Sequence, residues 1–174
     1  VNGARVMLMV YDYTVLAGTQ GIVGHAKMDR AFHLCARERL PLLLFPEGGG
    51  GRAGSFATVR SGLECTSFSA LAELRGKVPI IGAVSGFCFA GNAALLGTCD
   101  LVLATKSASI GMGGPAMIEG GGLGVVQPEL VGPATMHFDN GGVDVLVDTD
   151  EQLVFEAKRL MTIFARPALP PPHP

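Results

Sequence analysis

The sequence has little charge and no long apolar run. Only 16% of its 174 residues are charged, the formal net charge is −2, and Lys and Arg are scattered along the chain. It therefore lacks the basic patch that marks a nucleic-acid or membrane-surface protein. No apolar run approaches the roughly 20 residues that span a bilayer, and no charged and then apolar leader opens the chain. We expect a soluble, cytoplasmic protein without nucleic-acid or membrane partners.

The four cysteines lack the C-x-x-C spacing of a zinc knuckle or redox motif. They lie in apolar or helical surroundings, which is typical of reduced, buried thiols in a cytosolic protein. Two of the histidines, His25 and His33, are eight residues apart on an expected helix, which is too far for joint metal ligation, and His137 is isolated. We therefore predict no disulfide framework and no metal site in this chain.

Apolar segments and their spacing indicate an α/β fold in one domain. Residues 6–10 and 42–45 are apolar on both faces, as parallel strands covered by helices are, and residues 24–40 show helical spacing. Strand, helix and strand in this order form a crossover unit, so we expect a mainly parallel sheet with right-handed connections. A last helix is expected at about residues 150–164, with its apolar stripe facing the core or a docking surface.

Glycine is abundant, with 25 residues, and one glycine turn organises the centre of the chain. The turn Gly86-Phe-Cys-Phe-Ala-Gly91 lies between a buried strand that ends near Ser85 and a short apolar helix that opens near Gly91. A new strand is expected from Asp100. Because the first N–H groups of a helix have no partner within the helix, this turn is a place to bind an oxyanion.

A second glycine turn covers residues 47–54, directly after the expected strand 42–45. Its residues Gly49, Gly51 and Gly54 match G-x-G-x-x-G, a pattern that is typical of a dinucleotide-binding loop. The ribose-binding acid expected about 20 residues later is missing, and so is the Gly-Lys-Ser/Thr of a P-loop. We interpret the turn as a second close backbone approach at the carboxyl end of a strand, although a merely flexible loop is the alternative.

The first glycine turn, the apolar helix after it and Cys99-Asp100-Leu-Val resemble the oxyanion-hole signature of the crotonase superfamily. Members of this superfamily stabilise enolates of acyl-CoA thioesters. The resemblance implies a ββα superhelix and assigns two backbone donors, the N–H groups of Gly51 and Gly91, with Gly50 and Ala90 as their flanking residues. Donors about 2.7–3.1 Å from the thioester oxygen would stabilise an enolate by several kcal/mol.

Two carboxylates that enoyl-CoA hydratases of this superfamily use are missing. Laid over the motif, these glutamates would fall at Ala94 and near Gly114. Hydration or isomerisation is therefore disfavoured, because acid–base chemistry needs a titrating group within reach of the substrate. Ser85 before Gly86 also does not form G-x-S-x-G, so a nucleophile elbow is not supported.

Other segments are similar to the carboxyltransferase component of biotin-dependent acyl-CoA carboxylases. The segments that carry this resemblance are residues 10–21, 44–52, 113–124, 128–132 and 140–144. It implies that residues 1–165 are the N-terminal one of two related crotonase-like halves, followed by a Pro-rich linker or tail at 166–174. Asn2-Gly3 is a hairpin-turn signal without a strand before it, so we expect that the first strands of this half are missing.

The resemblance implies transfer of a carboxyl group from carboxybiotin to the alpha carbon of an acyl-CoA. Biotin would be displayed on a partner, because the chain has no Met-Lys-Met biotinylation context. The implied partners are the C-terminal carboxyltransferase half, a biotin carboxylase, a biotin carrier protein and further copies of the chain in a homo-oligomer. Arg52, Gly49 and Gly114 are the implied substrate-binding residues, and Arg52 could instead support its own loop.

Two alternatives stay open. A biotin-dependent acyl-CoA decarboxylase subunit uses the same geometry in reverse, whereas a non-catalytic crotonase-like binding or assembly module would use the glycines for packing. Acyl-CoA binding with the thioester near Gly51 and Gly91 separates the enzymes from the module. Glu119, expected after a methionine-bearing strand, is a candidate acid or base or an ion-pair partner that holds its loop.

Overall fold

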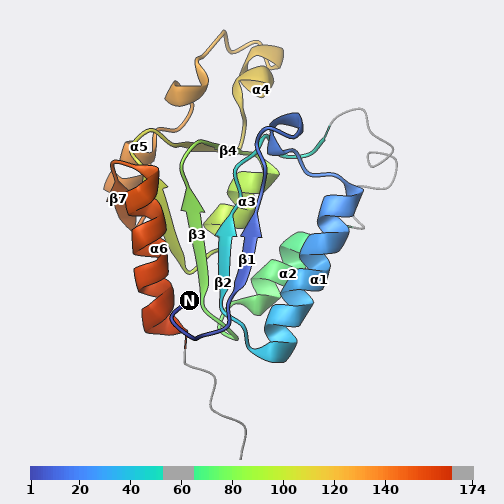
Figure 1. Cartoon of the computed structure of the whole chain (residues 1–174). Coiled ribbons are helices and arrows are strands. Elements are labelled where there is room, and N and C mark those ends of the chain that lie inside the picture. Colours follow the sequence, from blue (N-terminus) through green and yellow to red (C-terminus); the bar gives the residue numbers. More distant parts are fainter. Residues whose placement is uncertain (53–64, 166–174) are drawn as a thin grey trace, which may run out of the picture.

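A sheet of parallel strands forms the centre of the computed structural model, which describes residues 1–52 and 65–165. Five strands pair in the order β1-β2-β3-β5-β7, every pair in parallel. They are β1 (Met7–Val10), β2 (Leu42–Phe45), β3 (Ile80–Val84), β5 (Leu101–Thr105) and β7 (Val145–Val147). Their carboxyl ends point toward the top of Figure 1. The predicted parallel sheet is confirmed.

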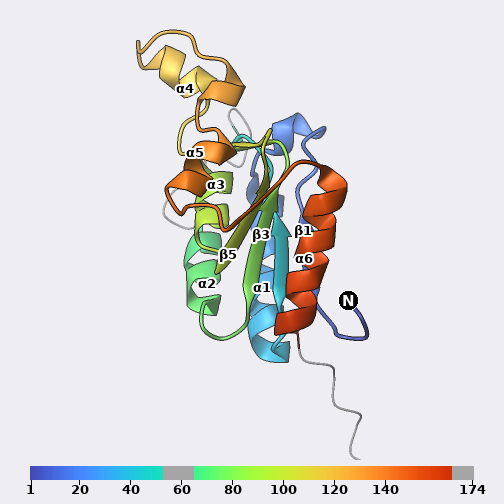
Figure 2. The same cartoon turned by 90° about the vertical axis from the view of Figure 1, so that its left-hand side faces the viewer.

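Helices cover both faces of this sheet, as Figures 1 and 2 show. The helices α1 (Ile22–Glu38), α2 (Ser67–Leu74) and α3 (Gly91–Gly97) lie on one face, and α6 (Asp150–Phe164) lies on the other. Leu42 and Leu44 pack toward the first group, whereas Leu43 packs toward α6, because successive strand residues point to opposite faces. Burial on both faces explains why β2 and β3 carry no polar side chain. The edge strand β1 is covered less, and its Leu8 and Val10 are exposed.

The apolar stripe of α6 is mostly core. Leu153, Ala157 and Met161 are buried against the sheet, while Phe164 at the end of the stripe is 43% exposed. The side chain of Thr149 caps the helix by accepting the N–H of Gln152. The predicted helix is confirmed within its expected bounds.

A second, two-stranded parallel sheet pairs β4 (Phe87–Phe89) with β6 (Ser109–Gly111). Each of these strands follows a turn at the end of a main-sheet strand, β4 after β3 and β6 after β5. The succession β3, β4 and α3 is one ββα unit of the predicted superhelix. Sequence analysis placed only a turn at residues 86–90 and missed β4.

Residues 112–130 extend from the carboxyl end of the sheet as an arm that carries α4 (Pro115–Gly120) and the 3-10 helix η3 (Pro128–Leu130) (Figure 1). Large apolar side chains on the arm are exposed, namely Met112, Met117, Leu123, Val125 and Leu130. The expectation of a strand before Glu119 was wrong, because Glu119 lies within α4. Its side chain is exposed and forms no ion pair with residues of the described ranges. The short helix α5 (Ala134–Asp139) then leads to β7.

The turn at Asn2-Gly3 has the backbone conformation of the predicted hairpin turn. Asn2 and Gly3 both have positive φ, 46° and 82°, and the Ala4 N–H bonds to the Val1 carbonyl at 2.9 Å. Gly54 and the predicted tail at 166–174 lie outside the described residues. Across the two described ranges, the helices are too short or too polar to cross a membrane.

Candidate active site

Two glycine turns meet at the carboxyl ends of the main strands. Gly48, in the turn after β2, donates its N–H to the Phe87 carbonyl (2.9 Å), and its own carbonyl accepts the Phe89 N–H (2.8 Å). These bonds join the turn to β4 in a parallel bridge. The predicted turns at residues 47–52 and 86–91 are therefore neighbours in the fold.

Gly50 lies directly against the turn at residues 86–91. It has a φ of +86°, and a Cβ at this position would lie 2.5 Å from the Ala90 Cβ and 3.3 Å from the Gly91 nitrogen. Only a residue without a side chain fits here. Standard bond lengths then place the Gly51 nitrogen within about 7 Å of the Gly91 nitrogen.

The neighbouring peptide groups set the direction of the Gly51 N–H. The Gly50 carbonyl accepts the Gln20 N–H at 2.7 Å. Because C=O and N–H point in opposite directions across a trans peptide, the Gly51 N–H points away from the Gln20 backbone. Neither Gly51 N–H nor Gly91 N–H has a hydrogen-bond partner within residues 1–52 and 65–165. Gly51 is exposed and Gly91 half-buried, so a ligand can approach.

Ala90, which flanks Gly91, is held in an unusual backbone conformation. Its φ is 52° and its ψ is −123°, a region that L-residues rarely adopt. Its N–H donates to the Gly111 carbonyl of β6 at 2.8 Å. The β4–β6 pairing therefore continues into the turn and fixes the start of α3.

Arg52 supports its own loop. Its Nε donates to Thr19 Oγ1 (3.2 Å) and its Nη2 donates to the Thr19 carbonyl (3.0 Å). These bonds agree with the second role expected for Arg52, which is to support its own loop rather than to bind substrate. Gly49 is held in the same loop by its N–H, which donates to the Ala17 carbonyl at 2.9 Å.

Gly114 lies on the other side of the turn at residues 86–91. It precedes α4, and a Cβ there would lie 3.3 Å from the Phe89 ring. Substrate binding by Arg52, Gly49 and Gly114 stays a prediction. Ala94 is a half-buried residue of α3.

Gln20 carries a buried amide beside Gly91. The residue is 4% exposed, and its Nε2 has no hydrogen-bond partner in the described part of the chain. Its Oε1 lies 2.9 Å from the position that a Gly91 Cβ would take. Burial raises the pKa of Tyr11, and the Gln20 side chain opposes part of this shift. The Tyr11 hydroxyl donates its proton to Met28 Sδ at 2.7 Å.

Sequence analysis missed two side chains that hold the turns. The Glu47 carboxylate accepts the N–H groups of Ser85 (2.6 Å) and Gly86 (3.1 Å) and so ties the first turn to the second. Asn92 is fully buried and bonds to Gly50. The sequence signal for Asn92 was a polar residue among the apolar residues of α3. The signal for Glu47 was an acid directly before a run of glycines.

A polar cluster lies on the α1–α2 side of the site. His25 Nδ1 is 3.1 Å from both Ser67 Oγ and Cys65 Sγ, and Ser67 bonds to Asp29. Burial lowers the pKa of His25, and Asp29 opposes part of this shift. Phe68, the next residue of α2, packs against His25 with a ring separation of 6.1 Å.

The cysteines are all free thiols, as expected. Cys35, Cys88 and Cys99 are buried, but Cys65 is only half-buried, so burial of all four was wrong. Burial raises the pKa of Cys35 to about 11 and that of Cys99 to about 12. Among the described residues, no three potential metal-ligating side chains come together.

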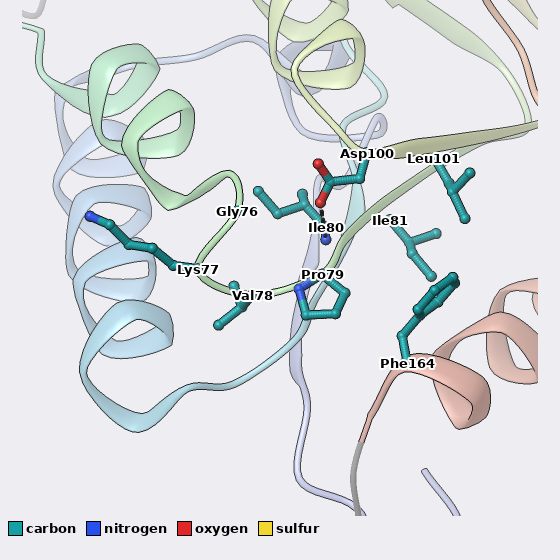
Figure 3. Close-up of a pocket in the computed structure, with 9 residues that line it drawn as sticks. All are labelled: Gly76, Lys77, Val78, Pro79, Ile80, Ile81, Asp100, Leu101 and Phe164. Carbon is teal, nitrogen blue, oxygen red and sulfur yellow. Dashed lines mark hydrogen bonds between the residues drawn. The ribbon is translucent and has the colours of Figure 1, made fainter.

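A separate pocket of about 380 Å³ lies at the opposite end of the sheet (Figure 3). It opens where β3 and β5 begin, between the Lys77–Pro79 segment and the Phe164 ring. The Asp100 carboxylate beside it accepts the Ile80 N–H at 2.9 Å. Ligands of parallel α/β sheets bind at the carboxyl ends of strands, so we place the candidate site at the glycine turns.

Comparison with known proteins identifies the family. A family model described as the carboxyl transferase domain matches residues 1–173. The chain belongs to this family. A structure of a single-chain, multi-domain long-chain acyl-CoA carboxylase is 54% identical, with a TM-score of 0.82 over 90% of this chain and 15% of that one. The predicted crotonase-like fold is thereby confirmed.

Curated relatives and a further structure agree. The biotin-dependent acetyl-/propionyl-coenzyme A carboxylase beta6 subunit of Mycobacterium tuberculosis is 25% identical over 95% of this chain. This chain spans 35% of that subunit's length. One chain of the Pseudomonas malonate decarboxylase hetero-dimer is 26% identical to this chain, with a TM-score of 0.78. The match covers 98% of this chain and 76% of that one.

Proposed function

We propose that this chain forms the acyl-CoA side of a carboxyltransferase site, in which the N–H groups of Gly51 and Gly91 bind the thioester oxygen. One observation supports the proposal above all. Two N–H groups from separate turns, both without a partner in the described ranges, lie within about 7 Å of each other. One oxygen atom accepts both bonds when the two nitrogens lie no more than about 6 Å apart, which is within this bound.

This arrangement suits the formation of an enolate. Removal of a proton alpha to a thioester moves negative charge onto the thioester oxygen, where the two N–H groups would hold it. Loss of one such donor typically raises the activation free energy of the reaction by about 2.7–4 kcal/mol. Carboxybiotin on a partner would supply the carboxyl group, and the biotin nitrogen that loses this group would accept the alpha proton, so that the exchange balances. The chain's own residues position the acyl-CoA, and the roles of Gly50 and Ala90 are to keep the two donors adjacent.

A groove beside the site supports a contact with the CoA moiety. It has a volume of about 530 Å³, lies between β1 and α1, and reaches Gly18 and Thr19. Lys27 and Arg52 both line it. The groove carries these two cationic side chains and one carboxylate, Asp12, and the cations would suit the phosphate groups of CoA. We therefore keep Arg52 as a substrate-binding residue in addition to its bonds to Thr19.

The arm at residues 112–130 supports association with other chains. Its exposed apolar side chains would be covered by a partner. A structural relative, a transcarboxylase 12S protein, assembles as a hexamer. We propose that residues 1–165 act as the N-terminal half of a carboxyltransferase, in a homo-oligomer that works with a C-terminal half, a biotin carboxylase and a biotin carrier protein. The four free thiols support a cytoplasmic location.

A decarboxylase is the second candidate. The observation in its favour is the similarity to malonate decarboxylase over 76% of that protein's chain. The same pair of N–H groups would then hold the enolate that forms when a carboxyl group leaves. Comparison of a simple acyl-CoA with its α-carboxylated counterpart as ligands would separate the two directions.

The test is acyl-CoA binding to the purified chain, followed by isotope-edited infrared spectroscopy of a ¹³C-labelled thioester carbonyl. Two N–H bonds should shift the carbonyl stretch to lower frequency than in water. Gly91→Val should weaken binding at least about tenfold, or about 1.4 kcal/mol, because its Cβ would lie 2.9 Å from Gln20 Oε1 and 3.2 Å from Phe68 Cζ. Gly97→Val in the same helix is the matched control, because nothing lies within 4 Å of its Cβ position.

Two results would contradict the proposal. One is binding of an acyl-CoA without any shift of the carbonyl stretch, since the thioester would then lie elsewhere. The other is equal affinity for the Gly91 and Gly97 variants. Failure of the unaltered chain to bind any acyl-CoA would instead favour a non-catalytic module.

A further inference from the structure

We propose that the side-chain amide of Asn92 sets the separation and direction of the two N–H groups and is thus a positioning residue. This inference rests on the proposed function, because it gives a role to the distance between Gly51 and Gly91. Asn92 immediately follows Gly91 in α3 and has no exposed surface. It does not contact the thioester itself.

The Asn92 amide joins three segments that are far apart in sequence. Its Oδ1 accepts the Gly50 N–H at 2.9 Å, and its Nδ2 donates to the Gly18 carbonyl at 3.4 Å. The fit around it is tight, since a Cβ on Gly48 would lie 2.5 Å from Nδ2. One planar group therefore ties α3 to the turn after β2 and to the loop after β1.

These bonds explain why a polar residue occupies this position. The neighbouring residues Ala93, Leu95 and Leu96 are buried and apolar, so helix packing alone would favour an apolar residue at 92 as well. Most buried side-chain polar groups have a hydrogen-bond partner, and the Asn92 amide has one for its acceptor and one for its donor.

The contact to Gly50 holds the peptide directly before the one that carries the Gly51 N–H. The Gly50 N–H is held by Asn92, and the Gly50 carbonyl is held by the Gln20 N–H at 2.7 Å. Both peptide groups that flank Gly50 are thereby oriented. Without Asn92, Gly50 itself would keep only the bond from the Gln20 N–H to its carbonyl, and it could rotate about its own φ. Gly51 would then move relative to Gly91.

A small movement of this kind should affect the enolate more than the ground state. Oxyanion donors act through position, and a misplacement of about 1 Å can reduce rate about a hundredfold. Loss of Asn92 should therefore leave acyl-CoA affinity within about threefold of the unaltered chain, because most of the CoA contacts lie elsewhere. The shift of the bound carbonyl stretch should largely disappear.

The experiment compares Asn92→Leu, which removes both bonds, with Asn92→Asp, which keeps the acceptor for Gly50. Asn140→Leu is the matched control, because Asn140 is exposed at the end of α5. Each variant is measured for acyl-CoA affinity and for the ¹³C carbonyl stretch of the bound thioester. We expect the shift to be lost in the Leu variant, partly kept in the Asp variant and unchanged in the control.

Hydrogen exchange on the unaltered chain gives a second test, which stands even if a variant does not fold. The Gly50 amide should exchange slowly because Asn92 holds it. The Gly51 and Gly91 amides should exchange quickly until an acyl-CoA binds. Fast exchange at Gly50, or a full carbonyl shift in a folded Asn92→Leu variant, would overturn the role of Asn92. Absence of any shift in the unaltered chain would instead refute the proposed function.

Discussion

Gly50→Ala is the substitution that most directly tests the contact between the two turns. An L-residue at a φ of +86° is destabilised by about 1–2 kcal/mol. The new Cβ would also lie 2.5 Å from the Ala90 Cβ, whereas carbon atoms pack at about 3.5–4.0 Å. The turns must therefore separate by about 1 Å, and such overpacking adds about 1–3 kcal/mol. The total loss should be about 2–5 kcal/mol.

Gly76→Ala is the matched control for this substitution. Gly76 has a φ of +75°, but nothing lies within 4 Å of its Cβ position. The control should lose only the backbone part, about 1–2 kcal/mol. Urea unfolding with the linear extrapolation gives both values. The difference between the variants isolates the steric contact.

Acyl-CoA affinity and the carbonyl stretch are measured on the same two proteins. The Gly50 variant should lose the carbonyl shift because its donors have moved apart, while the Gly76 variant should keep it. Equal loss of stability in both variants would refute the close contact between Gly50 and Ala90. A full carbonyl shift in a stably folded Gly50 variant would refute the link between this contact and the site.

Three further predictions concern side chains around the site. Gln20→Leu should raise the free energy of unfolding by up to about 1–3 kcal/mol, because an unpaired buried amide is removed; a lower urea midpoint would contradict this. Glu47→Gln should lower the free energy of unfolding by about 1–2 kcal/mol, because the N–H groups of Ser85 and Gly86 lose a charged acceptor. An unchanged urea midpoint at pH 7 would count against this prediction. The lowered pKa of His25 means that the unfolded chain binds this proton more readily, so stability should fall as pH drops below about 6.5. Urea unfolding at several pH values, with a His25→Gln comparison that lacks this fall, is the check.

The sequence was sufficient for β1, β2, β3 and β5, because each is mostly a run of apolar residues, but it did not predict β7 (Val145–Val147). Residues 42–45 and 80–84 are apolar on both faces, and the structure buries them between helices. The helix starting at Gly91 was also predictable, because its signal is local. The second sheet was not predictable, since β4 has only three residues and pairs with β6 about 20 residues later.

The sequence by itself determined the parallel α/β fold, the two glycine turns and the resemblance to carboxyltransferases. These features follow from local composition and from the order of the elements along the chain. Only the tertiary structure decided that the two turns touch through Gly50 and Ala90. It also decided which polar groups hold them, with Asn92 reaching 42 residues back to Gly50. Such contacts depend on the packing of distant segments, and no local pattern in the chain encodes that packing.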